Sequence, residues 1–196
     1  MAKKTGKNTK GKIISAAWDL FYEQGYDDTT IEEIVEASCT SKGSFYHYFG
    51  GKDALLGTLS DLFDAQYEEV LPQLNENDHA FDQLMFLNQE LFLMIDNRIS
   101  MDLIARLYSS QLTTRGQKHL LDHNRFYYKL LRKITAEGQQ KGELSKDVSV
   151  NEFVKAYALC ERALIYDWCI CNGEYSLVQY GKQMMPLFLQ SFYCKK

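Results

Sequence analysis

Apolar residues recur at helical spacing along almost the whole chain, and this periodicity restricts the fold more than any other feature. In the first such stretch, Ile13, Ala17, Leu20 and Phe21 fall at positions i, i+4, i+7 and i+8, on one stripe of a helix. Only two prolines occur in 196 residues, of which 45% are hydrophobic. The sequence therefore predicts an all-α protein, long enough for one domain or two small ones.

Capping residues and glycines indicate where these helices begin and end. Thr30 and Ser149 are each followed three residues later by a glutamate, which is the pattern of a capping box. Gly25 and Gly142 stand where helices are expected to stop. We expect three short helices, a longer connector that Pro72 closes, and then longer amphipathic helices, over residues 9–24, 30–38, 41–49, 52–71, 78–97, 99–111, 117–141, 150–172 and 176–193.

The charges are distributed unevenly along the chain. The net charge is −4, yet residues 1–12 carry five lysines and no acidic residue. Residues 1–52 hold seven lysines and seven acids, so the remaining 15 basic and 19 acidic groups account for the whole negative balance. A basic arm on an acidic body fits a local nucleic-acid footprint, and a solubilising, disordered tail explains the arm equally well.

Hydropathy and cysteine usage indicate the compartment. No apolar run is long enough for a membrane span, and no apolar segment follows the lysine-rich N-terminus, so we expect a cytoplasmic protein without a membrane partner. The odd number of cysteines shows no spacing typical of a disulfide framework, which fits a reducing compartment; they are Cys39, Cys160, Cys169, Cys171 and Cys194.

The stretch SKGSFYHYFGGK, from Ser41 to Lys52, is too polar for a core helix and too aromatic for a solvated loop. Phe45 and Phe49, four residues apart, can anchor one face of a short helix. The stretch follows a short capped helix and a tight turn, which is the sequence pattern of a helix-turn-helix. It therefore predicts a recognition helix that enters the major groove of DNA.

The residues of this helix suit two kinds of DNA contact. Small or thin residues can approach base edges, and at the start of the helix these are Ser41, Lys42, Gly43 and Ser44. Hydrogen bonds to phosphate oxygens set the register, and the candidate donors are Tyr46, His47 and Lys52. Taken singly, Tyr46 is equally a packing aromatic and His47 a solvated surface residue; the spacing of the set favours DNA binding.

This region resembles the DNA-binding region of the TetR family of bacterial transcriptional repressors. The resemblance covers Gly25 to about Leu56 and includes TTIEEIVEASCTSKGSFYHYFGGKDALL. It implies that Thr30 contacts phosphate and that the recognition-helix residues named above face the DNA. The sequence departs at Ser38, where the family commonly has Gly, so Ser38 is expected to adopt a positive φ. Cys39 replaces an aliphatic residue and is expected to pack as a small hydrophobe.

The resemblance also implies a division into two parts. Residues 1–51 would form the helix-turn-helix DNA-binding domain with its basic arm, and residues 52–196 an all-α ligand-binding and dimerisation domain. The aromatic and sulfur-containing candidates for an effector pocket are Phe92, Met101, Tyr108, Tyr127 and Cys160. The candidates for an isologous interface on the last two long helices are Tyr157, Leu164, Trp168, Tyr180, Met184, Leu187 and Phe188. Both sets are also what an intrachain core would use.

These features predict a homodimeric repressor that an unknown small-molecule effector releases from a palindromic, double-stranded DNA operator. The alternatives are a redox-sensing regulator that uses Cys39 and a helical binding protein or enzyme that retains the head. The sequence has no Gly-rich phosphate loop and no nucleophile elbow, so we expect no enzyme activity and no cofactor. His119 and His123 are spaced to share a metal on one helical face, but no acidic or thiol partner is adjacent, and no metal site is predicted.

Overall fold

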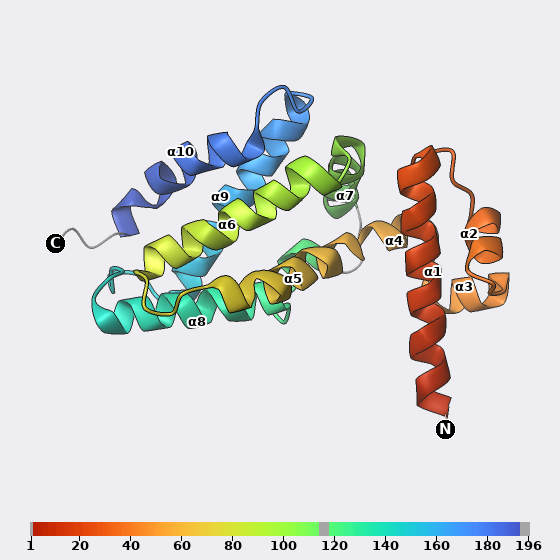
Figure 1. Cartoon of the computed structure of the whole chain (residues 1–196), viewed down its shortest axis with the longest axis horizontal. Helices are drawn as coiled ribbons and strands as arrows, with labels where there is room; N and C mark the ends of the chain where they lie inside the picture. The colour runs from red at the N-terminus through yellow and green to blue at the C-terminus, as the bar shows by residue number, and fades with distance from the viewer. Residues whose placement is uncertain (1, 114–117, 193–196) are drawn as a thin grey trace.

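The computed structural model of the chain describes residues 2–113 and 118–192, and these residues contain no β-strand (Figure 1). The all-α prediction is confirmed. The α-helices are α1 (Ala2–Gln24), α2 (Ile31–Ala37), α3 (Lys42–Tyr48), α4 (Asp53–Leu56), α5 (Leu59–Val70), α6 (Ala80–Arg98), α7 (Met101–Thr113), α8 (Phe126–Lys141), α9 (Val150–Ile170) and α10 (Leu177–Leu189). Short 3-10 turns follow three of these helices, η1 (Leu71–Gln73), η2 (His119–Leu121) and η3 (Gln190–Phe192).

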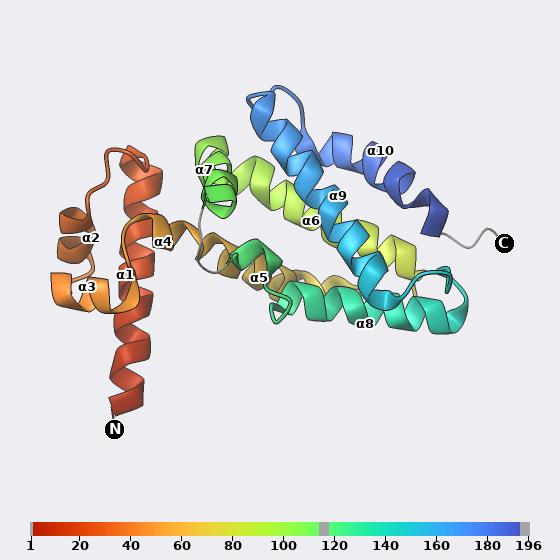
Figure 2. The ribbon, with the colours of Figure 1, turned by 180° about the vertical axis from the view of Figure 1, so that it is seen from behind.

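Helices α1, α2 and α3 pack together at one end of an elongated molecule, and we call them the head (Figures 1 and 2). Their contact is apolar, because Ile13, Ala17, Ile34 and Phe45 are completely buried. Thr30 forms the predicted capping box at the start of α2. The three short elements expected at the N-terminus therefore form one small core, as a helix-turn-helix requires.

The first helix begins earlier than the periodicity predicted. We expected residue 9, and the helix begins at Ala2, so the basic segment has a helical backbone. Lysine is a good helix former and no proline occurs in this segment, which allows the helix to extend beyond its apolar stripe. The side chains of Lys3, Lys4 and Lys7 lie outside the described residues.

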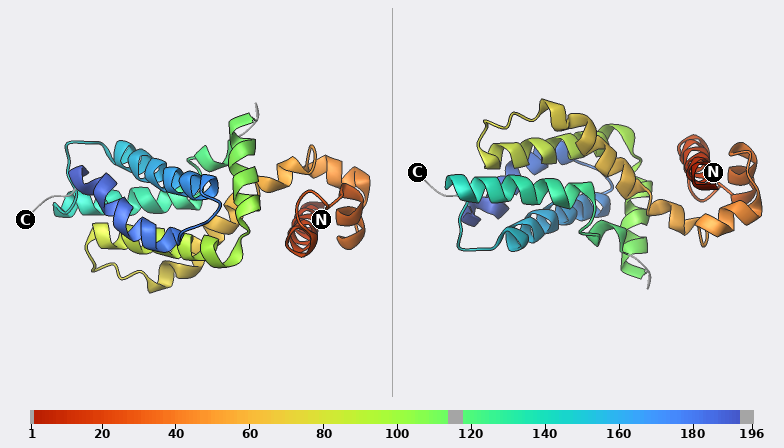
Figure 3. Two further views of the ribbon diagram at one scale, coloured as in Figure 1. Left: turned by 90° about the horizontal axis from the view of Figure 1, so that it is seen from above. Right: turned by 90° about the horizontal axis from the view of Figure 1, so that it is seen from below.

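The remaining helices form the body. Helix α10 packs on α6 and α9, while α5 packs on α6 and α8 (Figure 3). The α6–α10 contact is close at Gly181, where an added Cβ would lie 2.5 Å from the ring of Phe92. The capping box at Ser149 and the left-handed C-cap at Gly142, with φ of 75°, are present as predicted.

The expected single helix over 52–71 is divided into α4 and α5 at Gly57 and Thr58. The Thr58 hydroxyl donates to the carbonyl of Leu55 (2.6 Å) and accepts from Nε1 of Trp18 (2.9 Å), which ties the joint to α1. An added Cβ at Gly57 would lie 2.4 Å from Cδ2 of His119, so the backbone here passes directly beside η2. The prediction of one continuous helix over residues 52–71 was wrong, because tertiary contacts of Gly57 and Thr58 interrupt it.

The helix expected over 117–141 is also shorter than predicted. Residue 117 lies outside the described residues, η2 occupies 119–121, and α8 begins only at Phe126. Between η2 and α8, the backbone amide of Asn124 donates a hydrogen bond to Asp122 Oδ1 (2.9 Å). Such a local bond to a side chain competes with helix formation. The last helix ends at Leu189 rather than at 193, which also lies outside the described residues.

Candidate nucleic-acid interface and effector cavity

Ser41 is the N-cap of helix α3. Ser41 Oγ accepts a hydrogen bond from the backbone amide of Ser44 (3.1 Å), and the two hydroxyls are 3.0 Å apart. Phe45 is completely buried and Phe49 is 4% exposed, so they fix the inner face of the helix against α1 and α2. The start of α3 is consequently held in place while its outer face stays open to solvent.

The turn between α2 and α3 differs from the expectation by one residue. Ser38 has a φ of −77°, and it is Cys39 that adopts the positive φ, at 51°. Cys39 is also exposed rather than packed as a small hydrophobe. Both results have one cause, because the Ser38 hydroxyl lies inside, bonded to the carbonyl of Val35 (3.2 Å) and beside the Thr40 hydroxyl (2.8 Å), so the next residue must make the turn.

The outer face of α3 carries most of the predicted DNA contacts on one exposed surface, namely Ser41, Lys42, Gly43, Tyr46 and His47. A Cβ added at Gly43 would meet only Ser41 Oγ, at 3.8 Å, so nothing in the fold requires glycine here. Lys42 pairs with Glu32 of α2, and this hydrogen bond raises the pKa of Lys42 and lowers the pKa of Glu32. Thr30 is exposed at the start of α2, and its contact with phosphate stays a prediction.

Lys52 has partners within the chain. Its ammonium group donates to the carbonyls of Tyr26 (2.6 Å) and Thr29 (2.7 Å), and it lies 4.4 Å from the centre of the Tyr26 ring. These bonds hold the loop between α1 and α2. The contact of Lys52 with phosphate stays a prediction, and the geometry gives Lys52 a second task that the sequence did not reveal.

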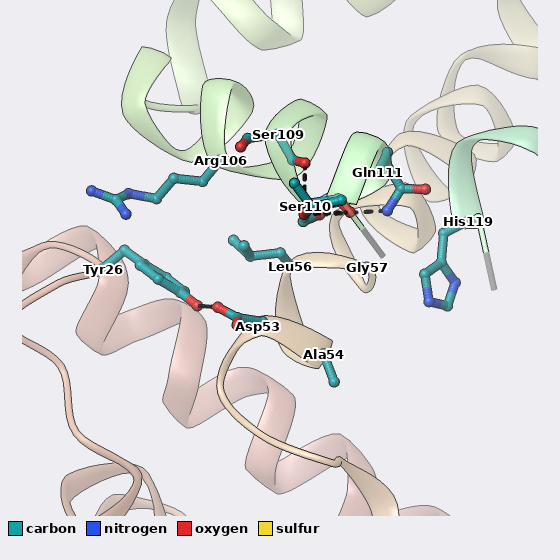
Figure 4. A pocket seen from close by; sticks show the side chains of 11 residues that line it. Tyr26, Asp53, Ala54, Leu56, Gly57, Arg106, Ser109, Ser110, Gln111 and His119 are labelled. Carbon is teal, nitrogen blue, oxygen red and sulfur yellow. Dashed lines mark hydrogen bonds between the residues drawn. The ribbon is translucent and has the colours of Figure 1, made fainter. Parts of the chain in front are cut away.

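A cleft of about 590 Å³ separates the head from the body (Figure 4). Arg106 of α7 crosses it, pairing with Asp27 of the head (2.5 Å) and with Asp102 of its own helix (2.7 Å). The Arg106 guanidinium lies 5.0 Å from the centre of the Tyr26 ring, and the Tyr26 hydroxyl donates to Asp53. Burial and this hydrogen bond raise the pKa of Tyr26. The cleft is thus a polar junction between the two parts.

A second, smaller cavity of about 40 Å³ lies in the body, among α5, α6, α7, α8 and α9, and is partly open to solvent. Its lining residues are Phe63, Tyr67, Leu91, Tyr108, Leu120, Arg125, Tyr127, Glu161, Arg162 and Ile165. Glu161 is 3% exposed and accepts hydrogen bonds from Asn88 Nδ2 (2.9 Å) and the Tyr127 hydroxyl (2.5 Å). Burial raises the pKa of Glu161, while these donors oppose the rise. No sequence signal identified Glu161 as a cavity residue, because a lone carboxylate on a helix usually faces water.

The five predicted pocket residues do not come together. Tyr108 and Tyr127 line the cavity, whereas Phe92, Met101 and Cys160 are not among its lining residues. Phe92 is completely buried against Gly181, where α6 meets α10. Core packing accounts for the position of Phe92, and contact of Phe92, Met101 and Cys160 with an effector stays a prediction.

The predicted interface set also divides. Tyr157, Leu164 and Trp168 are at most 7% exposed and belong to the core of their own chain, so their assignment to an interface was wrong. Tyr180 and Met184 are half-buried, and Leu187 and Phe188 are exposed. The outer stripe of α9 instead carries Leu159, Tyr166 and Ile170, which are 58%, 51% and 60% exposed.

Neither a metal-binding cluster nor a membrane-spanning helix is found in the described part of the chain. No cluster of three or more His, Cys, Asp or Glu side chains there is arranged to hold a metal ion. Among the described helices, none combines the length and apolar character needed to cross a bilayer.

The chain is similar to known bacterial regulators. The model of the bacterial regulatory proteins of the tetR family matches residues 13–59. The regulator HbdR of Aromatoleum sp. (strain CIB) is 29% identical over 195 residues, covering 94% of this chain and 81% of HbdR. CymR of Pseudomonas putida is 31% identical over 122 residues, which are 60% of each chain.

Solved structures show the same fold. FadR of Thermus thermophilus, described as a TetR-family repressor in complex with lauroyl-CoA, superposes with a TM-score of 0.78 at 22% identity, covering 95% of this chain and 96% of FadR. FadR of Bacillus subtilis, in complex with stearoyl-CoA, gives a TM-score of 0.69 at 20% identity and covers 94% and 100%. The architecture of head and body is therefore common to all three proteins.

Proposed function

We propose that the chain is a member of the TetR family of bacterial transcriptional regulators and that it is a homodimeric repressor released from a palindromic operator by a small-molecule effector. Its relatives are DNA-binding regulators and not enzymes. The mode of repression, the dimer, the operator and the effector are the proposal, and the following observations support them. The proposal includes a DNA-binding domain over residues 1–51 and a ligand-binding and dimerisation domain over residues 52–196.

The main support for DNA binding is the exposed outer face of α3. Lys42, Gly43 and Tyr46 are exposed on a short helix whose inner face is anchored by two buried phenylalanines. A helix held in this way can enter the major groove with its N-terminal residues at the base edges. We assign contacts with the bases or their flanking phosphates to Ser41, Lys42, Gly43 and Ser44, and phosphate contacts to Thr30, Tyr46, His47 and Lys52.

The exposed apolar stripes of α9 and α10 support a symmetric dimer. Leu159, Tyr166 and Ile170 lie on α9, and Leu187 and Phe188 lie on α10, which packs beside it. Large apolar side chains gathered on two neighbouring helices are costly to leave in water. Burying the same surface on a second copy of the chain would pair the two heads about a two-fold axis.

The effector would enter the body between α5 and α9, where the internal cavity lies. The two FadR proteins of the same fold are described in complex with acyl-CoA molecules, which makes an acyl-CoA or a similar amphipathic compound the leading class. The cavity is small in this structure, so an effector must move neighbouring helices to occupy it.

Helix α5 is positioned to transmit that movement. It lines the cavity through Phe63 and Tyr67 and continues through Gly57 and Thr58 to the head. The hydrogen bond from Trp18 to Thr58 joins this segment to α1. A shift of α5 would therefore change the separation of the two recognition helices, which must be about 34 Å apart to read successive major-groove faces.

The test is selection of bound duplexes from a random pool, followed by anisotropy titration of the enriched sequence. The proposal expects an inverted repeat bound at least about a thousandfold more tightly than random DNA. A pool without enrichment, or with an enriched site that has no symmetry, would contradict it.

Exposure of Cys39 beside the recognition helix favours a second candidate, a redox-sensing regulator with the same head. Peroxide should then weaken operator binding by the natural protein and leave a Cys39→Ser variant unaffected. Equal sensitivity of the two proteins would eliminate this candidate.

A further inference from the structure

The 40 Å³ cavity of the body contains a polar group that makes no hydrogen bond within the described residues. Tyr67 of α5 is 1% exposed, and its hydroxyl has no hydrogen-bond partner among the described residues. A buried hydroxyl that makes no hydrogen bond is destabilising, so such groups are rare unless a ligand or water completes them. Tyr67 therefore indicates that this cavity binds a partner with a hydrogen-bonding group.

Glu161 provides the second polar contact of the cavity. Its carboxylate is fixed by Asn88 and Tyr127, and the Tyr127 ring packs 5.3 Å from the Tyr67 ring, centre to centre. The charge of Glu161 also helps to raise the pKa of Tyr67, after burial itself, which fits a short separation. A carboxylate has about four acceptor positions, so Glu161 can accept one more hydrogen bond from a ligand.

The charges around the cavity balance. Arg125 is paired with Asp64 at 2.7 Å, and both side chains are mostly buried. Arg162 lines the cavity together with Glu161 and lowers the pKa of that carboxyl, which offsets part of the effect of burial. A cationic ligand group would meet two arginines and an anionic group would meet Glu161, so a neutral group fits best.

The rest of the wall is mainly aliphatic and aromatic, and Tyr108 adds one further hydroxyl; it is formed by Phe63, Leu91, Tyr108, Leu120 and Ile165. The volume of about 40 Å³ exceeds the roughly 10–15 Å³ that one water molecule requires, and it suits the end of a ligand rather than a whole one. The surrounding side chains therefore accommodate a hydrocarbon group with a single polar substituent.

We infer that this cavity is the effector subsite for the neutral, hydroxyl-bearing end of an apolar group, an alcohol or a phenol. The ligand hydroxyl donates to Glu161 of α9 and accepts from Tyr67 of α5. This inference rests on the proposed function, because it identifies what the effector places in the body. The same hydroxyl would link α9 to α5, the helix that continues into the head, so ligand binding could change the position of the head.

Four small probes test the inference on the full-length protein by calorimetry or ligand-observed NMR: 4-methylphenol, toluene, benzylamine and benzoate. We expect 4-methylphenol to bind about tenfold more tightly than toluene, and more tightly than either charged probe. Equal binding of toluene would overturn the inference, as would preference for benzylamine or benzoate, or no measurable binding of 4-methylphenol.

Tyr67→Phe is the decisive variant, with Tyr22→Phe in the head as the matched control. Tyr67→Phe should weaken 4-methylphenol binding by about five- to tenfold, leave toluene binding unchanged, and not lower the melting temperature, because it removes a buried hydroxyl without a partner. Unchanged affinity for 4-methylphenol would overturn the inference. Operator binding without any probe is measured in parallel, so that a failure of the proposed function appears there and not in the probe series.

Discussion

Replacing Lys52 with methionine separates a contact within the head from a contact with DNA. The Lys52 ammonium donates to two carbonyls at 2.6 and 2.7 Å and lies over the Tyr26 ring. Hydrogen bonds of a charged donor contribute about 1.5–3 kcal/mol, and a half-exposed site belongs at the lower end of that range. We therefore expect a loss of about 2 kcal/mol, which lowers the melting temperature by roughly 4–8 °C in a chain of this size.

The assay combines thermal unfolding with operator binding over a series of salt concentrations. Each lost phosphate contact would reduce the slope of log K against log salt by about 0.9. Lys42→Met is the matched comparison, because Lys42 is exposed and pairs only with exposed Glu32 among the described residues. We expect Lys42→Met to flatten the slope with an almost unchanged melting temperature.

Because Lys52 holds the loop of the head and is also assigned a phosphate contact, Lys52→Met should lower both the melting temperature and the salt slope, whereas Lys42→Met should lower only the slope. If Lys52→Met leaves the melting temperature unchanged and reduces the salt slope by about 0.9, Lys52 binds phosphate and its hydrogen bonds to Tyr26 and Thr29 do not stabilise the head. If both quantities change, the residue performs both tasks.

Three further predictions concern the recognition helix, the interface and the cavity. Gly43→Val should abolish specific binding without changing the melting temperature appreciably, because only Ser41 Oγ lies within 4 Å of the new Cβ; a footprint on the same operator would contradict this docking. Leu187→Glu combined with Tyr166→Glu should give monomers in sedimentation and weaken operator binding, and a variant that stays dimeric would place the interface elsewhere. The raised pKa of Glu161 means that the folded protein binds this proton more tightly than the unfolded chain does, so the group's contribution lowers stability as the pH rises from the ordinary carboxyl pKa through the raised value. Glu161→Gln should remove that part of the pH dependence of urea unfolding above the ordinary carboxyl pKa, and an unchanged slope would contradict burial of the charge.

The head could be predicted from the sequence because its signals are local. A capping box, a tight turn and two phenylalanines four residues apart determine α2 and α3 without reference to the rest of the chain. Even here the turn was displaced by one residue, since the inward hydroxyl of Ser38 depends on a bond that periodicity does not reveal.

The body was harder to predict because its helices are apolar on more than one face. Helix α9 has one stripe with Tyr157 and Leu164 and another with Leu159 and Tyr166, and only packing against α7, α8 and α10 decides which is buried. The stripe chosen from the sequence was the inner one. The sequence analysis did not predict the cavity for a related reason. Tyr67 and Glu161 are 94 residues apart in the chain, so no local pattern connects them.

Footprinting of the selected operator, together with the mass of the complex, tests the central claim most directly. A symmetric dimer that reads DNA through α3 predicts a two-fold symmetric protected region whose half-sites lie about one helical turn apart or a multiple of it. It also predicts that the bound mass is an even number of chains and that Gly43→Val loses the protection. Protection of a single unpaired half-site by one chain, or protection that Gly43→Val retains, would contradict the account.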